Sequence, residues 1–537
     1  MTTSVCLKPA TGLEGMMERH WEIEQLMVRS GVGFGTSGAR GTVAAMTDEV
    51  CYAYTLAFLQ HLEQQGQTGP GKLAIAGDLR SSTVRIMAAV ATAARSRGYQ
   101  VINSGFVPSP ALALYGMSNG LPAIMVTGSH IPDDRNGLKF NTPSGEILKS
   151  DETAIRAQMV AIPASRFDRA GSLSVPPELP KVDPAAFERY VRRYLDFFPA
   201  GCLDGFRVGI YEHSSVASKV LKRVLTTLGA EVIALGYSER FVPVDTEAIR
   251  AEDRVLARRW STEYRLDSVV STDGDGDRPM VSDENGDWIR GDVAGILCAR
   301  YLGADTVVTP VSSNTAVEKT GAFSEVLRTR IGSPFVIEAM NRACREGAKT
   351  VVGYEANGGF LTATRIDREE RSLSPLPTRD AVIVVLILLR LARESGGVSR
   401  LVASLPDRHT ASDRIQGFPA EWARLKLDSL SPNGADDPGG FVEIFGIGGS
   451  PVGSDITDGL RVTFENGEII HLRPSGNAPE IRCYVESDSE QRSARLLAHC
   501  LRTLESWKED FMHRSPPGAE DRVAGQPVDQ RGLRSRT

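Results

Sequence analysis

Short apolar runs alternate with segments of helical periodicity along most of this chain, and this alternation constrains the fold more than any other feature. The pattern runs through residues 48–103 to an apolar run at residues 123–126, restarts at residue 184, and begins a third round at residue 306. Such alternation predicts a mostly parallel sheet with helices on both faces. We therefore expect three successive α/β units.

The last folded segment follows another pattern, because its apolar runs lie close together. Runs at residues 459–464, 469–472 and 481–485 precede a single helical segment at residues 489–508. This order predicts an α+β unit with an antiparallel sheet. Beyond residue 514 the chain is rich in Pro, Gly, Arg and Asp and has almost nothing to bury, so we expect disorder there.

The chain of 537 residues is too long for one hydrophobic core, and residues 163–184, rich in Pro, Ser and charge, suggest the first boundary. We expect a helical N-terminal extension at residues 1–30, α/β domains at 31–165, 182–290 and 291–406, an α+β domain at 407–512 and a disordered tail at 513–537.

Composition argues against several classes of protein. A net charge of -6 does not suit a general nucleic-acid binder. The most apolar run, residues 381–389, is far shorter than the roughly 20 residues of a membrane span and reads as a buried helix. The 7 cysteines include no Cys-x-x-Cys pair, which favours reduced thiols in a cytoplasmic protein. Residues 1–19 carry charges and no apolar core, so we expect no secretory signal.

The loop after the run at residues 123–126 carries the first candidate site. Residues 127–140 read TGSHIPDDRNGLKF, which places Ser129 at a strand end, where open α/β sheets usually bind ligands. A serine followed by His130, with Lys139 ten positions on, is a candidate nucleophile with proton-transfer partners. Taken alone, the Ser-His pair equally suits a polar turn.

An acidic loop, DGDGDR at residues 273–278, is a candidate metal site. Asp273, Asp275 and Asp277 stand at alternate positions and can converge on one hard cation such as Mg²⁺. An EF-hand is rejected because Arg278 occupies the position that needs glycine and a strand precedes the loop. On this loop alone, a solvated acidic turn is an equal alternative.

Two further loops suit parts of a sugar phosphate. Residues 353–359, GYEANGG, place Glu355 and Asn357 between glycines, where they suit sugar hydroxyls, although a simple βα turn is an alternative. Residues 473–482, RPSGNAPEIR, combine two arginines, a hydroxyl and an amide into a possible anion cradle, although a polar turn with surface arginines is simpler.

A glycine-rich stretch at residues 31–41 reads as a loop and contains a literal Gly-x-Gly-x-x-Gly match at residues 33–38. What precedes it looks helical rather than extended, so we reject a dinucleotide-binding fold. Arg40, just after it, is a candidate phosphate contact.

Four such loops in this order resemble those of the α-D-phosphohexomutase family, which includes phosphomannomutases and phosphoglucomutases. The resemblance covers roughly residues 30–510. Residues 127–130 resemble the phosphoserine motif, 273–278 the metal loop, 353–359 the sugar loop and 473–477 the phosphate loop, and residues 35–41 and 78–82 resemble two further family motifs.

The resemblance implies four domains around a central cleft: three α/β domains with mixed sheets and a smaller α+β domain. It also implies an isomerase in which Ser129 carries a phosphoryl group and transfers it to a hexose phosphate. Hexose 1,6-bisphosphate would be intermediate and activator, and Mg²⁺ would be held by Ser129, Asp273, Asp275 and Asp277.

By the same resemblance, the catalytic residues are Ser129, His130, Lys139 and Arg40, with Lys139 the first choice as general base and His130 the second. The substrate-binding residues are Arg278, Glu355, Asn357, Arg473, Ser475, Gly476, Asn477 and Arg482. The expected partner is a small-molecule sugar phosphate, with no nucleic acid and no membrane.

The choice of sugar rests on residues 129–132 and 355–359, which look most like those of bacterial phosphomannomutases. We therefore expect mannose 6-phosphate and mannose 1-phosphate as substrates. A mutase for glucose or glucosamine phosphate is the alternative, and a hydrolase or a non-catalytic sugar-phosphate binding protein is weaker. The chain departs from the family at Ile131 and Asn477, and residues 436–458 read as an extra glycine-rich loop.

Overall fold

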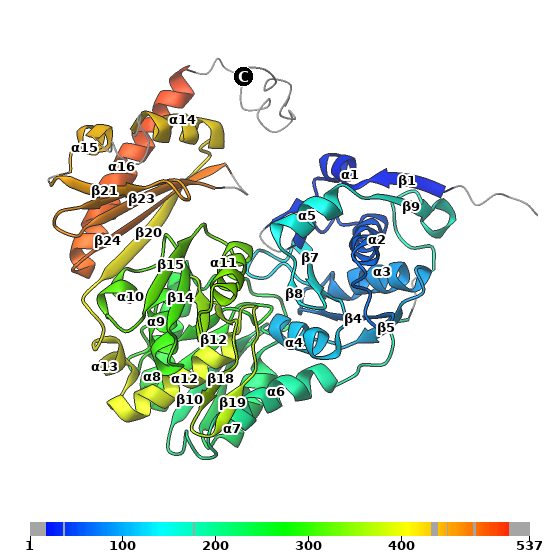
Figure 1. Cartoon of the computed structure of the whole chain (residues 1–537), viewed down its shortest axis with the longest axis horizontal. Helices are drawn as coiled ribbons and strands as arrows, with labels where there is room; N and C mark the ends of the chain where they lie inside the picture. Colours follow the sequence, from blue (N-terminus) through cyan, green and yellow to red (C-terminus); the bar gives the residue numbers. More distant parts are fainter. Residues whose placement is uncertain are drawn as a thin grey trace, which may run out of the picture. The chain divides into compact units, whose positions relative to one another are not determined.

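A computed structural model describes residues 18–35, 38–175, 178–430, 439–447, 449–475 and 479–514 (Figure 1). The chain divides into two compact units. The first contains Met1–Ile289 and Gly359–Arg393, and the second contains Arg290–Gly358 and Glu394–Thr537. The predicted disordered tail lies almost entirely outside the described residues.

The first sheet of the first unit is mixed and has the strand order β2-β3-β7-β6-β4-β5, with β8 on β7. The strands are β2 (Gly33–Phe34), β3 (Gly38–Thr42), β4 (Lys72–Gly77), β5 (Gln100–Asn103), β6 (Ala123–Val126), β7 (Arg135–Thr142) and β8 (Gly145–Glu146). The helices are α2 (Asp48–Gln64), α3 (Thr83–Ser96), α4 (Ser109–Asn119) and α5 (Lys149–Arg156). Apart from Lys72 at the start of β4, strands β4 and β6 are apolar because helices cover this sheet, as Figure 1 shows in blue and cyan.

The second sheet of this unit has the order β11-β10-β12-β13. Its strands are β10 (Arg207–His213), β11 (Glu231–Tyr237), β12 (Ser268–Thr272) and β13 (Pro279–Val281), and its helices are α6 (Ala185–Phe197), α7 (Ser218–Thr227) and α8 (Ala251–Tyr264). β10 is parallel to β11 and β12, whereas β13 is antiparallel to β12.

Both sheets are therefore mixed, as the family resemblance implies. The expectation of a mostly parallel sheet is wrong for the first sheet, in which β4 is parallel to β5 and β6 but β2-β3, β3-β7, β6-β7 and β7-β8 are antiparallel pairs. The strand that follows each site loop returns antiparallel: β7 beside β6, and β13 beside β12. The connections, residues 127–134 and 273–278, are too short for a crossover, which needs about a dozen residues.

In the second unit, β14 (Thr306–Pro310) is parallel to β15 (Glu325–Thr329) and β16 (Val351–Tyr354). The helices beside them are α9 (Gly291–Tyr301), α10 (Ala316–Lys319) and α11 (Ser333–Arg345). The chain also contains β17 (Phe360–Thr362), β18 (Ile366–Arg368), β19 (Arg371–Leu373), α12 (Ala381–Ser395) and α13 (Val398–Val402). The apolar run at residues 381–389 is the buried part of α12, as expected, and none of the described helices is long and apolar enough to cross a membrane.

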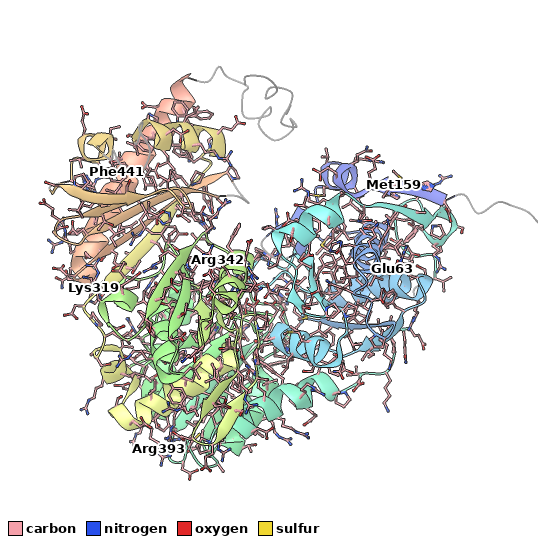
Figure 2. The ribbon with its side chains drawn as sticks, in the orientation of Figure 1. Glu63, Met159, Lys319, Arg342, Arg393 and Phe441 are labelled. Carbon is pink, nitrogen blue, oxygen red and sulfur yellow. The ribbon has the colours of Figure 1, made fainter. Side chains whose placement is uncertain are left out.

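The C-terminal part of the second unit is α+β, as predicted, with an antiparallel sheet of order β20-β24-β23-β22-β21. Its elements are β20 (His409–Gln416), β21 (Pro451–Asp455), β22 (Leu460–Phe464), β23 (Ile469–Pro474), β24 (Glu480–Ser487), α14 (Ala420–Leu430), α15 (Gly439–Phe445) and α16 (Glu490–Arg514). Phe441, labelled in Figure 2, stacks on Phe445 with ring centroids 4.5 Å apart and belongs to the core of this domain.

Three local predictions are corrected. Residues 18–22 of the expected N-terminal helix form β1 (Glu18–Glu22), which pairs with β9 (Met159–Pro163), and helix α1 spans only Ile23–Ser30. Within the glycine-rich stretch at residues 31–41, β2 pairs antiparallel with β3. The expected loop at residues 436–458 contains α15 and β21. In each case strand pairing or packing overrides the local sequence signal.

Candidate functional site

Ser129 lies on the connection between β6 and β7, as the sequence predicted. Its backbone is left-handed, with φ of 57°, and the residue is fully buried. The Ser129 N–H donates to Thr127 Oγ1 at 2.7 Å, and the Thr127 hydroxyl donates to Asp78 Oδ2 at 2.7 Å. A serine in this conformation costs about 1 kcal/mol, so the surrounding bonds must hold it there.

The three aspartates of the acidic loop follow β12, a strand, which agrees with the rejection of an EF-hand. The Ser129 hydroxyl donates to Asp273 Oδ2 at 2.6 Å, so the candidate nucleophile and the acidic loop are in direct contact. Gly276 has φ of 72°, the conformation that lets the loop turn between Asp275 and Asp277.

The acidic loop fits a hard divalent cation. One carboxylate oxygen from each of Asp273, Asp275 and Asp277 lies within 4.8 Å of the others. Oδ1 of Asp275 and Oδ1 of Asp277 are buried and accept no hydrogen bond within the described part of the chain. Unpaired buried carboxylate oxygens are costly, and burial together with the neighbouring carboxylates raises the pKa of Asp273 well above its usual range. An all-oxygen donor set of this kind suits Mg²⁺.

Lys139, on β7, contacts the same loop. Its Nζ donates to Asp275 Oδ2 and to Asp277 Oδ2, both at 2.6 Å. Burial alone would lower the pKa of Lys139, but the two carboxylates raise it above its ordinary value. The ammonium group therefore offsets part of the negative charge of the acidic loop.

The sequence analysis missed two residues that contact the acidic loop. Ser109, at the start of α4, donates from Oγ to Asp275 Oδ2 at 2.6 Å. Arg379, just before α12, places Nη1 3.6 Å from Asp277 Oδ2. Neither residue has a local pattern that signals its role, because each lies more than a hundred positions from the loop it contacts.

His130 lies between Ser129 and Arg278. Its Nδ1 accepts a hydrogen bond from Arg278 Nη1 at 2.8 Å and lies 3.4 Å from Ser129 Oγ. Burial and the adjacent guanidinium lower the pKa of His130 to about 3. The imidazole is therefore neutral, and its Nδ1 lone pair is already engaged by Arg278.

Arg40 lies on β3, opposite Gly137 of β7. Burial and the neighbouring cations Arg278 and Arg379 lower the pKa of Arg40 to about 10, so it stays charged at neutral pH. Among the residues that the structure describes, none forms a hydrogen bond with this guanidinium. Arg40, Arg278 and Arg379 thus add positive charge around the acidic loop, which suits a phosphate.

Glu355 and Asn357 belong to the second unit and follow β16, on the predicted loop. Both are buried, and the Gly358 N–H donates to Glu355 O at 2.9 Å to close a tight turn. A Cβ on Gly291 would lie 2.1 Å from Gly358 N, so the start of α9 packs closely against this turn. The loop is therefore rigidly placed within its own unit.

Arg473 and Arg482 lie directly opposite each other on β23 and β24. Arg473 Nε donates to Asp458 Oδ2 at 2.9 Å, and Arg482 Nε donates to Glu480 Oε1 at 2.9 Å. The Ser475 N–H donates to Glu480 O at 2.8 Å, which fixes the start of the phosphate loop. The other two predicted members, Gly476 and Asn477, lie outside the described residues.

Comparison with known proteins gives a consistent result over the whole length. Four family models match the chain: phosphoglucomutase/phosphomannomutase alpha/beta/alpha domain I at residues 31–165, domain II at 188–286, domain III at 290–409 and the C-terminal domain at 412–502.

Individual relatives agree. The phosphomannomutase of Salmonella muenchen is 41% identical over 493 residues, which covers 91% of this chain and 99% of the relative. The phosphomannomutase of Sinorhizobium fredii is 40% identical, covering 89% and 99%. The phosphoglucosamine mutase of Mycobacterium ulcerans is 28% identical, covering 86% and 96%. A solved structure of a phosphoglucomutase/phosphomannomutase family protein from Burkholderia thailandensis has the same fold, with a TM-score of 0.65 and 20% identity, covering 88% of this chain and 97% of that one.

Proposed function

This chain belongs to the phosphoglucomutase/phosphomannomutase family, and we therefore propose that it interconverts mannose 6-phosphate and mannose 1-phosphate through phosphoserine at Ser129. As a member of this family it is an isomerase that moves a phosphoryl group within a hexose phosphate. Mannose is proposed because the relatives named phosphomannomutase are more similar to this chain than the one named phosphoglucosamine mutase.

The observation that carries the proposal is the contact between Ser129 Oγ and Asp273 Oδ2 at 2.6 Å, beside a lysine and two further aspartates. Phosphoryl transfer depends mainly on positioning and on neutralising charge. We propose that Asp273, Asp275 and Asp277 hold Mg²⁺, which supplies Lewis-acid stabilisation of the transferring group when bound. Arg40 and Arg278 bind phosphate oxygens nearby.

Each half-reaction moves one phosphoryl group. The bond between phosphorus and Ser129 Oγ breaks, its electron pair stays on Oγ, and Oγ takes up a proton from a general acid to become a hydroxyl. A bond between phosphorus and the sugar hydroxyl oxygen forms, and the hydroxyl proton passes to a base. The product, hexose 1,6-bisphosphate, then returns its other phosphoryl group to Ser129 by the reverse exchange.

We propose that Lys139 takes the base role ahead of His130, after its ammonium group has lost the proton that it shares with Asp275 and Asp277 in this structure. Lys139 Nζ lies 2.6 Å from carboxylates of the acidic loop that Ser129 also contacts. His130 Nδ1, in contrast, already accepts a hydrogen bond from Arg278. His130 then serves to orient Arg278.

The remaining residues bind the part of the substrate that does not react. Glu355 and Asn357 accept and donate hydrogen bonds to sugar hydroxyls, and Arg473, Ser475, Gly476, Asn477 and Arg482 hold the second phosphate. A fixed phosphate site allows either end of the bisphosphate to be presented for transfer. The 7 scattered cysteines, with no Cys-x-x-Cys pair, suit reduced thiols, so we propose that the reaction takes place in a reducing compartment, the cytoplasm.

Intact-protein mass spectrometry tests this proposal. Wild type incubated with mannose 1,6-bisphosphate should carry one phosphoryl group, lose it to added mannose 1-phosphate, and fail to gain it as Ser129→Ala. Ser144→Ala, on the turn between β7 and β8, serves as the control and should behave as wild type. A Ser129→Ala protein that keeps full turnover would contradict the assignment.

A further inference from the structure

Arg80 is buried beneath the loop that carries Ser129. It follows β4, its guanidinium is fully buried, and all of its N–H groups are used. Nε donates to Asp78 Oδ2 at 3.0 Å. Nη2 donates to the carbonyls of Ser129 at 2.8 Å and Ile131 at 2.5 Å, and Nη1 donates to those of Pro132 at 2.5 Å and Arg135 at 3.0 Å. A guanidinium has five N–H donors in a fixed plane, so this pattern fixes four carbonyl groups of one loop at once.

Arg80 and its partner Asp78 together fix both sides of the strained Ser129. On its N-terminal side, the Ser129 N–H is held by Thr127, which bonds to Asp78. On its C-terminal side, the Ser129 carbonyl is held by Arg80, which also bonds to Asp78. A left-handed serine persists only where its surroundings determine the conformation on both sides. Asp78 and Arg80 supply that constraint.

The faces of the Arg80 guanidinium are also covered. Its Cζ lies 3.9 Å from the centroid of the Phe241 ring. A Cβ on Gly128 would lie only 2.7 Å from the same carbon, so residue 128 must be glycine for the guanidinium to stay in place. Phe241 also abuts Gly274 of the acidic loop, where an added Cβ would lie 2.7 Å from the ring. The Arg80 side chain therefore links the serine loop to the acidic loop.

We propose that Arg80 is a positioning residue for phosphoryl transfer: it holds the Ser129 loop in the one conformation that directs Oγ at Asp273. It contacts Ser129 through the backbone carbonyl and not through the hydroxyl, so it acts through the backbone. The inference rests on the proposed function, because it assigns Ser129 as the residue that carries the phosphoryl group.

The first test is chemical rescue of Arg80→Ala. A displacement of about 1 Å can cost on the order of 100-fold in rate, so kcat should fall by about that factor with KM changed less than about threefold. Added guanidinium ion should restore kcat at least about tenfold, whereas urea, which is neutral, should not. Arg85→Ala is the control, because Arg85 is half-buried in the same domain and bonds Asp48 and the carbonyl of Met46, away from Ser129.

A double-mutant cycle tests the mechanism without requiring rescue. Gly128→Ala should lower kcat by displacing the guanidinium, but should cost much less when added to Arg80→Ala, because the group it displaces is gone. Additive losses from the two substitutions would overturn the proposal, as would a folded Arg80→Ala protein with wild-type kcat. If Arg80→Ala does not fold, the hydrogen-exchange comparison of Arg80→Lys with wild type decides instead.

Hydrogen exchange separates this inference from the proposed function. Amides of residues 128–135 should exchange faster in Arg80→Ala or Arg80→Lys than in wild type, with the β-strands of the domain unchanged. If wild type turned over no hexose phosphate, the proposed function would fail, yet the loop measurement would still decide whether Arg80 holds the loop. Unchanged exchange in this loop would overturn the inference even in an active enzyme.

Discussion

Ser129 Oγ lies 2.6 Å from Asp273 Oδ2, although the two residues are 144 positions apart in the chain. One follows β6 of the first sheet and the other follows β12 of the second. Both loops turn back into an antiparallel strand, which brings each loop to the end of a buried parallel strand. The nucleophile and the acidic loop are thus placed by the packing of two sheets within one compact unit.

Removing one carboxylate of the acidic loop should weaken metal binding before it affects folding. Asp275→Asn is expected to weaken Mg²⁺ binding at least about tenfold in calorimetric titration and to lower turnover, because Asp275 offers a buried oxygen with no other described hydrogen bond. Asp287→Asn, in an exposed ion pair with Arg258, is the control. Full activity of Asp275→Asn in EDTA would contradict the metal assignment.

Lys139 should matter for stability as well as for catalysis. Lys139→Met removes the cation that contacts both Asp275 and Asp277 at 2.6 Å, and breaking a buried pair of this kind costs about 3 kcal/mol of the free energy of unfolding. Saturating Mg²⁺ should recover part of this loss, since it neutralises the same carboxylates, but turnover should stay low. Urea unfolding with and without Mg²⁺ measures both effects. The account is wrong if the loss is the same with and without the metal.

Binding of the sugar phosphate at the phosphate loop should depend on Asp458. This carboxylate accepts from Arg473 Nε and from the Ile331 N–H, both at 2.9 Å, so it fixes the arginine against the segment before α11. Asp458→Asn should raise KM for the sugar phosphate about tenfold, the value of one charge-assisted hydrogen bond, and change kcat little. Steady-state kinetics of Asp458→Asn should show the higher KM, and Asp413→Asn, at an exposed position, is the control. A fall in kcat at constant KM would show that Asp458 has a different role.

Acid should destabilise the C-terminal domain through His471. Burial lowers its pKa to about 4, and its Nε2 donates to Asp458 O while the buried Nδ1 has no described partner. Below about pH 6.5 the unfolded chain therefore binds a proton at His471, whereas the folded chain binds it only near about pH 4. The free energy of unfolding consequently decreases as the pH is lowered through that window.

The size of this effect can be measured. Between about pH 7 and about pH 5, His471 should account for roughly 2 kcal/mol of the lost free energy of unfolding. Urea unfolding of His471→Gln should show a pH loss smaller by about that amount, while the exposed His409→Gln should lose as much as wild type. Equal losses in all three proteins would show that His471 does not titrate in this way.

Much of the site could be predicted because its loops follow short apolar strands. The run Ala123–Val126 ends at the serine loop and Ser268–Thr272 ends at the acidic loop, so a local pattern marks each strand end. Arg80, Ser109 and Arg379 could not be placed in this way. Their roles come from side chains that reach across the fold, and no local periodicity encodes such contacts.

Elements with weak local signals were also missed. β21 (Pro451–Asp455) contains proline and glycine, and these residues predict a loop. Its register with β22 is irregular, so only the observed pairing identifies it as a strand. β1 (Glu18–Glu22) carries three charged residues and becomes a strand only by pairing with β9. The partner of β1 lies far along the chain, whereas β21 pairs with the next strand and is concealed by its own residues.

The most direct test of the central claim is a phosphorus NMR time course. Mannose 1-phosphate, glucose 1-phosphate and glucosamine 1-phosphate would be offered separately with Mg²⁺ and a trace of the matching hexose 1,6-bisphosphate. The account predicts that a 6-phosphate signal grows fastest from mannose 1-phosphate and is absent with Ser129→Ala. Release of free phosphate, or no change with any of the three sugars, would contradict it.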